Sequence, residues 1–230
     1  AADAINPEGP TIAGVLIEPL QGEAGVVIPP KGYIAGVQQL CKKYNVLFAA
    51  DEIQTGYART GPDFVTDALP ERPDIIIVSK AMGAGLLACA AIGGRKDVMD
   101  VFDPGSHGAT YSGNPLSSAV SLEVIKMMKE GQMQEFSMKR GRELLNAVQA
   151  LDYGFITDIR SPEGYWLGVE LDSPERAHEF CIRMVLDQSV ACKDAHNTVR
   201  ISPPFTVLDK DANHIAKAII ETARSMQASP

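Results

Sequence analysis

The chain has 230 residues and a mass of 24.7 kDa, which is enough to bury a substantial hydrophobic core. A hydrophobic fraction of 45% and a charged fraction of 22% are typical of a globular protein and exclude a disordered or fibrous chain. The formal net charge of -8 makes nucleic acid a poor candidate partner, and no apolar run is long enough to predict a membrane span.

The cysteines and histidines are dispersed along the chain. No CxxC, HExxH or CxxC…H pattern occurs, so we expect no metal site. Scattered cysteines indicate free thiols in a reducing compartment, which predicts a cytoplasmic location and leaves a mitochondrial one open. These cysteines are Cys41, Cys89, Cys181 and Cys192.

The first half of the chain alternates apolar runs with a helical segment. Residues 11–18, 46–50, 74–79 and 88–93 read as strands, and residues 33–44 have helical spacing. Continuous apolar strands connected in this way predict a parallel α/β sheet covered on both faces. Charged residues stand at three strand ends, where such sheets bind their ligands, and these residues are Glu18, Asp51 and Lys80.

After about residue 114 the pattern changes to α+β. The predicted helices span residues 115–130, 133–151, 175–188 and 210–226, and the predicted strands span 165–171, 189–192 and 198–201. We therefore expect two domains, 1–124 and 125–230, of which the second is the smaller.

Two of the charged strand ends suggest amine chemistry. Lys80 enters a Gly-rich turn, as a lysine that forms a Schiff base requires, although an ordinary surface lysine also fits. Asp51 follows a buried strand and suits a protonated pyridine nitrogen. A helix cap or an ion pair with Arg59 is the alternative for Asp51.

Two further segments suggest anion binding. Residues 105–115 (GSHGATYSGNP) combine small residues, hydroxyls and backbone amides before a helix, so Thr110 is a candidate phosphate ligand; a flexible loop is the alternative. Arg200 stands on a short strand before Pro-Pro, where it suits a carboxylate clamp; a surface arginine is the alternative.

Taken together, the motifs resemble the class III (ornithine-type) aminotransferases, which are pyridoxal phosphate enzymes of fold type I. The residues that carry the resemblance occur in the family's order: EPLQGEAG at 18–25, ADEIQTG at 50–56, ARTG at 58–61, PDI at 73–75, SKA at 79–81, HGATYSGNPL at 107–116 and VRISPP at 199–204. The sequences of these motifs are most similar to those of ornithine δ-aminotransferases, followed by those of acetylornithine and 4-aminobutyrate aminotransferases. The resemblance implies the large α/β domain of fold type I followed by a smaller α+β domain.

The resemblance also implies roles for the candidate residues around the cofactor. Lys80 would bind pyridoxal 5'-phosphate as a Schiff base and move the catalytic proton. Asp51 would hold the pyridinium nitrogen, and Gln54 would contact the 3-oxygen of the ring. Thr110 would bind the phosphate of a neighbouring subunit's cofactor, which implies a homodimer or a higher assembly.

The remaining implied roles concern the substrates. Arg200 would bind the carboxylate of 2-oxoglutarate, Glu23 would mask Arg200 when ornithine is bound, and Glu18 would be a second glutamate of the active site. The expected reaction moves the δ-amino group of ornithine to 2-oxoglutarate.

The chain is about half as long as the family's usual chains. We therefore expect the C-terminal part of a split, cleaved or truncated aminotransferase that needs a complementary N-terminal chain. An inactive subunit stays the alternative from another functional class.

Overall fold

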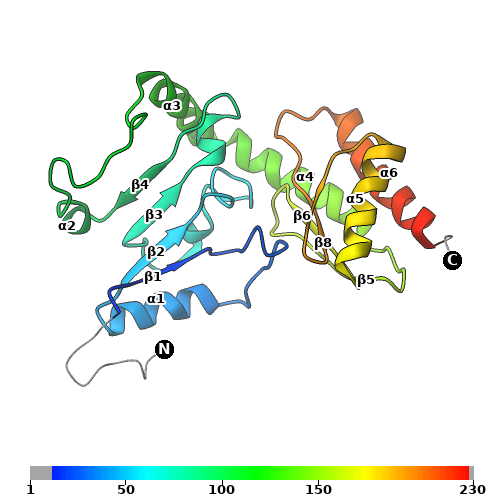
Figure 1. Cartoon of the computed structure of the whole chain (residues 1–230), viewed down its shortest axis with the longest axis horizontal. Coiled ribbons are helices and arrows are strands. Elements are labelled where there is room, and N and C mark those ends of the chain that lie inside the picture. The colour runs from blue at the N-terminus through cyan, green and yellow to red at the C-terminus, as the bar shows by residue number, and fades with distance from the viewer. Residues whose placement is uncertain (1–11, 228–230) are drawn as a thin grey trace. The chain divides into compact units, whose positions relative to one another are not determined.

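The structure is a computed structural model that describes residues 12–227, and the chain divides into two compact units (Figure 1). The first unit contains Pro29–Tyr57 and Phe64–Lys129, together with the described residues up to Pro19. The second unit contains Leu20–Ile28, Ala58–Asp63 and the described residues from Glu130 onward. The predicted division into domains 1–124 and 125–230 stays a prediction. In the compact units, Leu20–Ile28 and Ala58–Asp63 group with the second half of the chain.

The first unit is built on a sheet with the strand order β1-β2-β3-β4. The first three strands are parallel, as the sequence predicts, whereas β4 runs antiparallel to β3. The prediction of a parallel sheet is therefore confirmed for β1, β2 and β3 and wrong for β4, because the chain returns from β3 to β4 without the long crossover that a parallel strand needs. The elements of this unit are β1 (Gly14–Ile17), α1 (Tyr33–Lys43), β2 (Leu47–Asp51), η2 (Val65–Ala68), β3 (Ile75–Val78), η3 (Lys80–Gly83), β4 (Ala91–Gly94), α2 (Lys96–Met99) and α3 (Pro115–Lys129).

The helices of the first unit begin and end at recognisable signals. Gly32 adopts a left-handed conformation before α1, whose last turn carries two lysines that favour a helix C-terminus. Asn114 caps α3, because its Oδ1 accepts hydrogen bonds from the backbone N–H groups of Leu116 and Ser117 at 2.9 and 3.2 Å. The predicted helices over 33–44 and 115–130 are thereby confirmed.

The second unit is a four-stranded antiparallel sheet, ordered β5-β6-β8-β7, packed with helices α4, α5 and α6. One continuous core of buried side chains lies between them, including Phe180, Leu171 and Ile219. The elements are α4 (Gln132–Val148), β5 (Ile156–Arg160), β6 (Leu167–Leu171), α5 (Pro174–Gln188), β7 (Lys193–Ala195), β8 (Thr198–Ile201) and α6 (Asp209–Gln227).

Two strands of this unit differ from the sequence prediction. β5 was not predicted, because its sequence ITDIR mixes charged and apolar residues and faces the core only in part. The strand predicted at 189–192 begins instead at Lys193, because Ser189 ends α5 in a left-handed conformation. Within residues 12–227, no helix combines the length and the apolar character needed to cross a membrane.

Candidate functional site

Three parallel strands of the first unit end side by side at one edge of its sheet. Ile17 of β1 lies opposite Ala50 of β2, and Asp51 lies opposite Ile77 of β3. Glu18 directly follows β1, Asp51 is the last residue of β2, and Lys80 comes two residues after β3. The parallel directions therefore bring all three predicted residues to the same edge.

Asp51 is half-buried, and its carboxylate is fixed by a local hydrogen bond. The backbone N–H of Ile53 donates to Asp51 Oδ1 at 3.0 Å, so one oxygen orders the turn after the strand. The cap-like role that the sequence left open for Asp51 is thus part of the structure. Arg59, the other suggested partner, donates to the backbone carbonyls of Tyr165 and Pro203 at 2.8 Å each.

Glu52 is a buried carboxylate that the sequence analysis did not single out. Its Oε1 accepts from the backbone N–H and the hydroxyl of Thr66 at 2.8 and 2.9 Å, and its Oε2 accepts from the Thr55 hydroxyl. Burial raises the pKa of Glu52, although these hydrogen bonds act in the opposite direction. An acidic pair directly after an apolar strand was the signal in the sequence, and Glu52 braces the turn next to Asp51.

Lys80 opens the short helix η3 with a backbone φ of 45°, a left-handed conformation that is unusual for a residue other than glycine. Such strain is typical of positions that a function requires. The side chain is exposed and lines an open hollow of about 460 Å³. The other lining residues are small: Ser79, Ala88, Cys89 and Ala90.

These residues fit the cofactor that the resemblance implies. A lysine amine can bind the aldehyde of pyridoxal phosphate, and a carboxylate on the neighbouring strand can bind a pyridinium nitrogen. Gln54 is half-buried and follows Asp51 by three residues, in the turn after the same strand. The hollow beside Lys80 is open and lined by small side chains, and the described residues that line it do not include Asp51 or Gln54.

Thr110 lies in the exposed segment before α3, within residues 105–115. Gly105 and Gly113 have φ values of 88° and 67°, so the segment turns sharply on either side of Thr110. The phosphate-binding role of Thr110 stays a prediction.

A second group of predicted residues meets within the second unit. Arg200 donates from Nη1 to Glu23 Oε1 and from Nη2 to Glu23 Oε2, both at 3.0 Å, and from Nη1 to the Gly22 carbonyl at 3.0 Å. The Arg200 side chain is only 9% exposed, so the alternative of a surface arginine is wrong. Within the described part of the chain, Arg200 Nε is buried without a hydrogen-bond partner. Arg200 thus makes a two-pronged pair with Glu23 and keeps one buried donor.

Searches for related proteins match this chain over most of its length. The family model described as "Aminotransferase class-III" matches residues 2–223. An ornithine aminotransferase of Oceanobacillus iheyensis is 41% identical over 200 residues, which cover 86% of this chain and 49% of that protein. An ornithine aminotransferase 1 of Staphylococcus aureus is 41% identical over 210 residues, covering 91% of this chain and 52% of the relative.

Solved structures show the same relationship. A crystal structure of the ornithine aminotransferase from Toxoplasma gondii superposes with a TM-score of 0.89 at 32% identity, covering 97% of this chain and 54% of that chain. A second structure of the Toxoplasma protein contains pyridoxal phosphate at partial occupancy. An acetylornithine aminotransferase from Elizabethkingia anophelis has a TM-score of 0.85 at 33% identity, covering 93% of this chain and 54% of the other. The chain spans about half the length of the curated relatives it matches.

Proposed function

We propose, since the chain belongs to the class III aminotransferase family, that the whole protein transfers the δ-amino group of ornithine to 2-oxoglutarate. The family consists of transaminases of fold type I that depend on pyridoxal phosphate, and the fold of this chain is part of that fold. The observation that carries the proposal is the placement of Asp51 and Lys80 at adjacent ends of parallel strands β2 and β3.

The residues of the first unit would bind and operate the cofactor. When bound, pyridoxal phosphate supplies an electron sink for the carbanion that amino-group transfer requires. Lys80 would hold the cofactor through its ε-amine and afterwards carry the proton to and from the reacting carbon. Asp51 would accept a hydrogen bond from the ring nitrogen and keep it protonated, and Gln54 would orient the ring through its 3-oxygen.

The residues of the second unit would recognise substrate carboxylates. Arg200 is preorganised for a carboxylate, because its two Nη atoms already hold the two oxygens of Glu23. Glu23 would occupy Arg200 while the cationic diamine reacts, and the dicarboxylate acceptor would take its place. Glu18 would be a second carboxylate facing the diamine.

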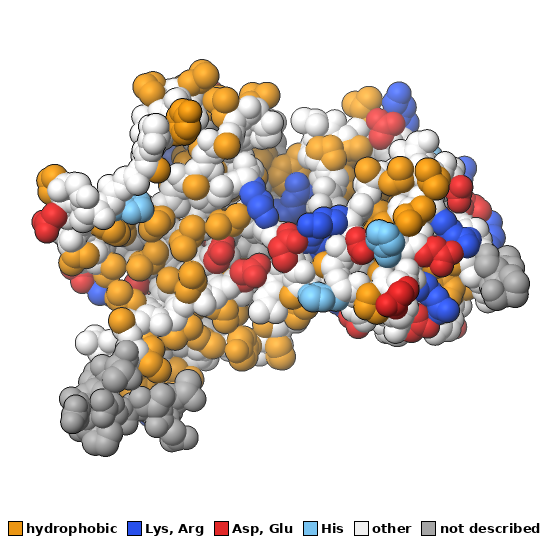
Figure 2. Space-filling view, viewed as in Figure 1, with side chains coloured by type: hydrophobic (Ala, Val, Ile, Leu, Met, Phe, Trp, Pro, Cys, Tyr) orange, Lys and Arg blue, Asp and Glu red, His pale blue; other side chains and the backbone are white. Residues whose placement is uncertain are grey.

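The proposed whole protein contains more chain than this. In the described residues, β1 pairs only with β2 and β4 only with β3, so both sheet edges have backbone groups that could pair with further strands. Figure 2 shows hydrophobic side chains gathered on the surface of the first unit, and the exposed fractions of Leu16 and Leu86 are 62% and 75%. We propose that a complementary N-terminal region covers this surface, and that Thr110 binds a neighbouring subunit's cofactor in a homodimer.

The direct test is an amino-transfer assay on the whole protein with added pyridoxal phosphate. We expect glutamate to form from 2-oxoglutarate, most rapidly with ornithine as the donor. Faster turnover with acetylornithine or 4-aminobutyrate would reassign the donor within the family. No turnover with any of the three donors would indicate an inactive subunit.

A second measurement locates the chemistry on this chain. Borohydride reduction of the yellow holoenzyme should attach the cofactor covalently to Lys80, which peptide mapping identifies. Lys80→Ala should abolish both turnover and the covalent label, while an exposed lysine of α1, Lys42, can be replaced by alanine without loss of either. A label on any other lysine would contradict the proposed site.

A further inference from the structure

The carboxylate of Glu23 contacts two cations of the second unit. Its Oε2 lies 3.0 Å from Arg200 Nη2 and 3.4 Å from Lys193 Nζ. Lys193 is the residue of β7 that lies directly opposite Arg200 on β8. One carboxylate oxygen is therefore within reach of two positive charges on neighbouring strands.

The two cations differ in their surroundings. The Arg200 side chain is 9% exposed and binds both oxygens of Glu23, whereas the Lys193 side chain is 69% exposed and approaches one oxygen at a longer distance. A buried, two-pronged pair is stronger than an exposed single contact. In this arrangement Arg200 is the primary partner of Glu23, and Lys193 is the secondary one.

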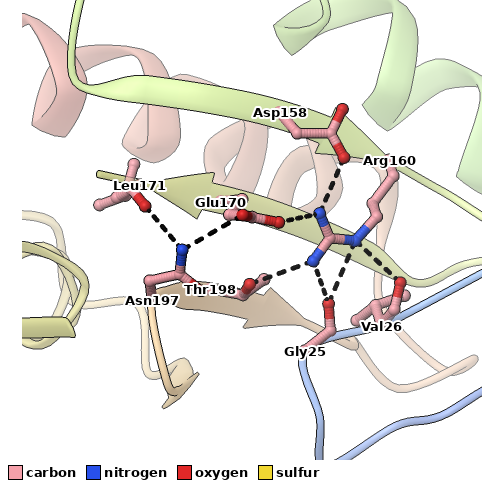
Figure 3. Close-up of polar contacts among 8 residues, drawn as sticks. All are labelled: Gly25, Val26, Asp158, Arg160, Glu170, Leu171, Asn197 and Thr198. Atoms are coloured by element: carbon pink, nitrogen blue, oxygen red, sulfur yellow. Dashed lines mark hydrogen bonds and ion pairs between the residues drawn. The ribbon is translucent and has the colours of Figure 1, made fainter. Parts of the chain in front are cut away.

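Arg160 fixes the turn that carries Glu23. Its guanidinium donates to the carbonyls of Gly25 and Val26 at 2.7 and 2.9 Å and to the hydroxyl of Thr198, on the Arg200 strand, at 3.1 Å (Figure 3). The backbone groups of Gln21 and Val27 close the same turn with hydrogen bonds of 2.9 and 3.1 Å. With the backbone held in this way, movement of Glu23 is confined to its side chain.

We propose that Lys193 is a specificity-determining residue that holds the Glu23 carboxylate when a substrate carboxylate displaces it from Arg200. The inference rests on the proposed function, in which Arg200 binds the carboxylate of a dicarboxylate acceptor. Displacement places two carboxylates near one arginine, and their repulsion opposes binding unless Glu23 has another cation. Lys193 is within a side-chain rotation of that role, because it already touches Glu23 Oε2.

Lys193 therefore favours the acceptor over the amino donor. With the donor bound, Glu23 stays on Arg200 and depends little on Lys193. With the dicarboxylate bound, Glu23 has lost Arg200, and Lys193 offsets a larger share of its charge. Removing the ammonium should weaken dicarboxylate binding about three- to five-fold, the factor that a partly exposed ion pair supplies.

The test measures binding of glutarate, an unreactive dicarboxylate, to the whole protein with its cofactor. Calorimetric titration of Lys193→Gln should show the three- to five-fold weaker affinity, and the KM for 2-oxoglutarate should rise while the KM for the amino donor stays constant. Lys217→Gln is the matched control, because it removes the same charge from an exposed position on α6. Equal effects of the two variants, or an equal rise in both KM values, would overturn the inference.

A double-mutant cycle shows whether Lys193 acts through Glu23. In the Glu23→Gln background, Lys193→Gln should have no effect on glutarate affinity; a persisting loss would mean that Lys193 binds the ligand directly, against the proposal.

Arg200→Gln separates the inference about Lys193 from the proposed function. If it abolishes glutarate binding while Lys193→Gln changes nothing, the inference fails and the proposed function stands. If Arg200→Gln has no effect either, the proposed carboxylate site itself is wrong.

Discussion

The two compact units bury their apolar side chains to very different extents. In the second unit, 17 buried residues form one cluster that extends from α4 to α6. Among the described residues of the first unit, the cluster around α1 and β2 contains four, and four more apolar side chains are buried elsewhere in that unit: Ile34, Cys41, Phe48 and Ala50 in the cluster, and Tyr57, Val78, Val124 and Met128. Large apolar side chains of the first unit, such as Leu86 and Tyr111, are instead 75% and 84% exposed.

Within residues 12–227, the second unit therefore has one large continuous core, and the first unit has a smaller one. A domain becomes stable when the burial of apolar surface outweighs the entropy of ordering the chain. The continuous core of the second unit favours that balance. The first unit, which carries Asp51 and Lys80, presents apolar surface and sheet edges that suit the complementary region proposed above.

The largest expected difference between the two units is in the rate of amide hydrogen exchange. In the 230-residue chain alone, amides of β6 and β8 should exchange at least about a hundredfold more slowly than those of β2 and β3, because local opening is easier where fewer apolar contacts resist it. Adding the N-terminal region of a related aminotransferase should slow exchange in β2 and β3 and leave β6 and β8 unchanged. Equal protection of the two sheets in the isolated chain would refute the comparison.

A matched pair of leucines provides the next test. Leu171→Ala removes a side chain with 0% exposure from the core of the second unit and should cost about 2–5 kcal/mol of unfolding free energy. Leu86→Ala, at 75% exposure in the first unit, should stay within about 0.5 kcal/mol. The single tryptophan, Trp166, is 3% exposed in the second unit, so its fluorescence during urea denaturation reports the Leu171 effect. Hydrogen exchange of β3 amides reports the Leu86 effect.

The sequence predicted the strand ends better than it predicted the sheet. Apolar runs that stop at Glu18, Asp51 and Lys80 were sufficient to place three charges at one edge, because residue order along a strand fixes where it ends. The antiparallel direction of β4 was not predictable in this way, since strand direction depends on how the connection closes in space. Arg200 was likewise identified as a carboxylate clamp, whereas its pairing with Glu23, 177 positions away, was expected only from the family resemblance.

Other residues escaped the sequence analysis because their environment, not their type, makes them important. In the sequence, nothing distinguishes Glu52 from the neighbouring Asp51. In the structure Glu52 is completely buried, and it organises the turn by accepting hydrogen bonds from Thr55 and Thr66. Arg160 sits in a strand that mixes charged and apolar residues, and its bonds to the Glu23 turn reach back more than a hundred residues along the chain. Long-range hydrogen bonds of this kind leave no periodic signal in a sequence.

Two arginines with similar partners test the effect of burial on ion pairs. Arg160 of the second unit binds Asp158 and Glu170 and has a side chain 16% exposed, whereas Arg95 of the first unit binds Asp74 and Asp97 and is 55% exposed. Arg160→Met should cost about 2–3 kcal/mol, because it leaves Glu170 Oε2 and the carbonyls of the Glu23 turn without the hydrogen bonds that Arg160 donates. Arg95→Met should cause little measurable change, because solvent takes over its role.

Trp166 fluorescence during urea denaturation measures the effect of Arg160→Met. Hydrogen exchange of β3 amides measures the effect of Arg95→Met. Arg160→Lys should recover only part of the loss, since an ammonium cannot span the separate acceptors that the guanidinium binds. A full recovery by lysine would mean that charge alone, and not the shape of the network in Figure 3, holds the turn.

The smallest effect concerns two buried tyrosines, one in each unit. Burial raises the pKa of Tyr57 to about 12 from its ordinary value of 10.0. Burial also raises the pKa of Tyr165, but the positive charges of Arg140 and Arg59 oppose that rise. A tyrosine with a raised pKa binds its proton more tightly in the folded chain, so stability declines as the pH rises from the unfolded pKa toward the folded one.

Tyr57→Phe should therefore reduce the decline in stability between about pH 10 and about pH 12, because no phenol remains to ionise on unfolding. The substitution keeps the edge-to-face contact with Phe64, whose ring centroid is 5.7 Å away. Urea midpoints followed by circular dichroism at about pH 9 and about pH 11 measure the change, and the difference in tyrosinate absorbance between the two proteins gives the titration of Tyr57. Tyr165→Phe is the matched variant and should change the pH dependence less, because nearby arginines already favour its ionised form. The reverse order would mean that the first unit leaves Tyr57 accessible to water, which its 3% exposure argues against.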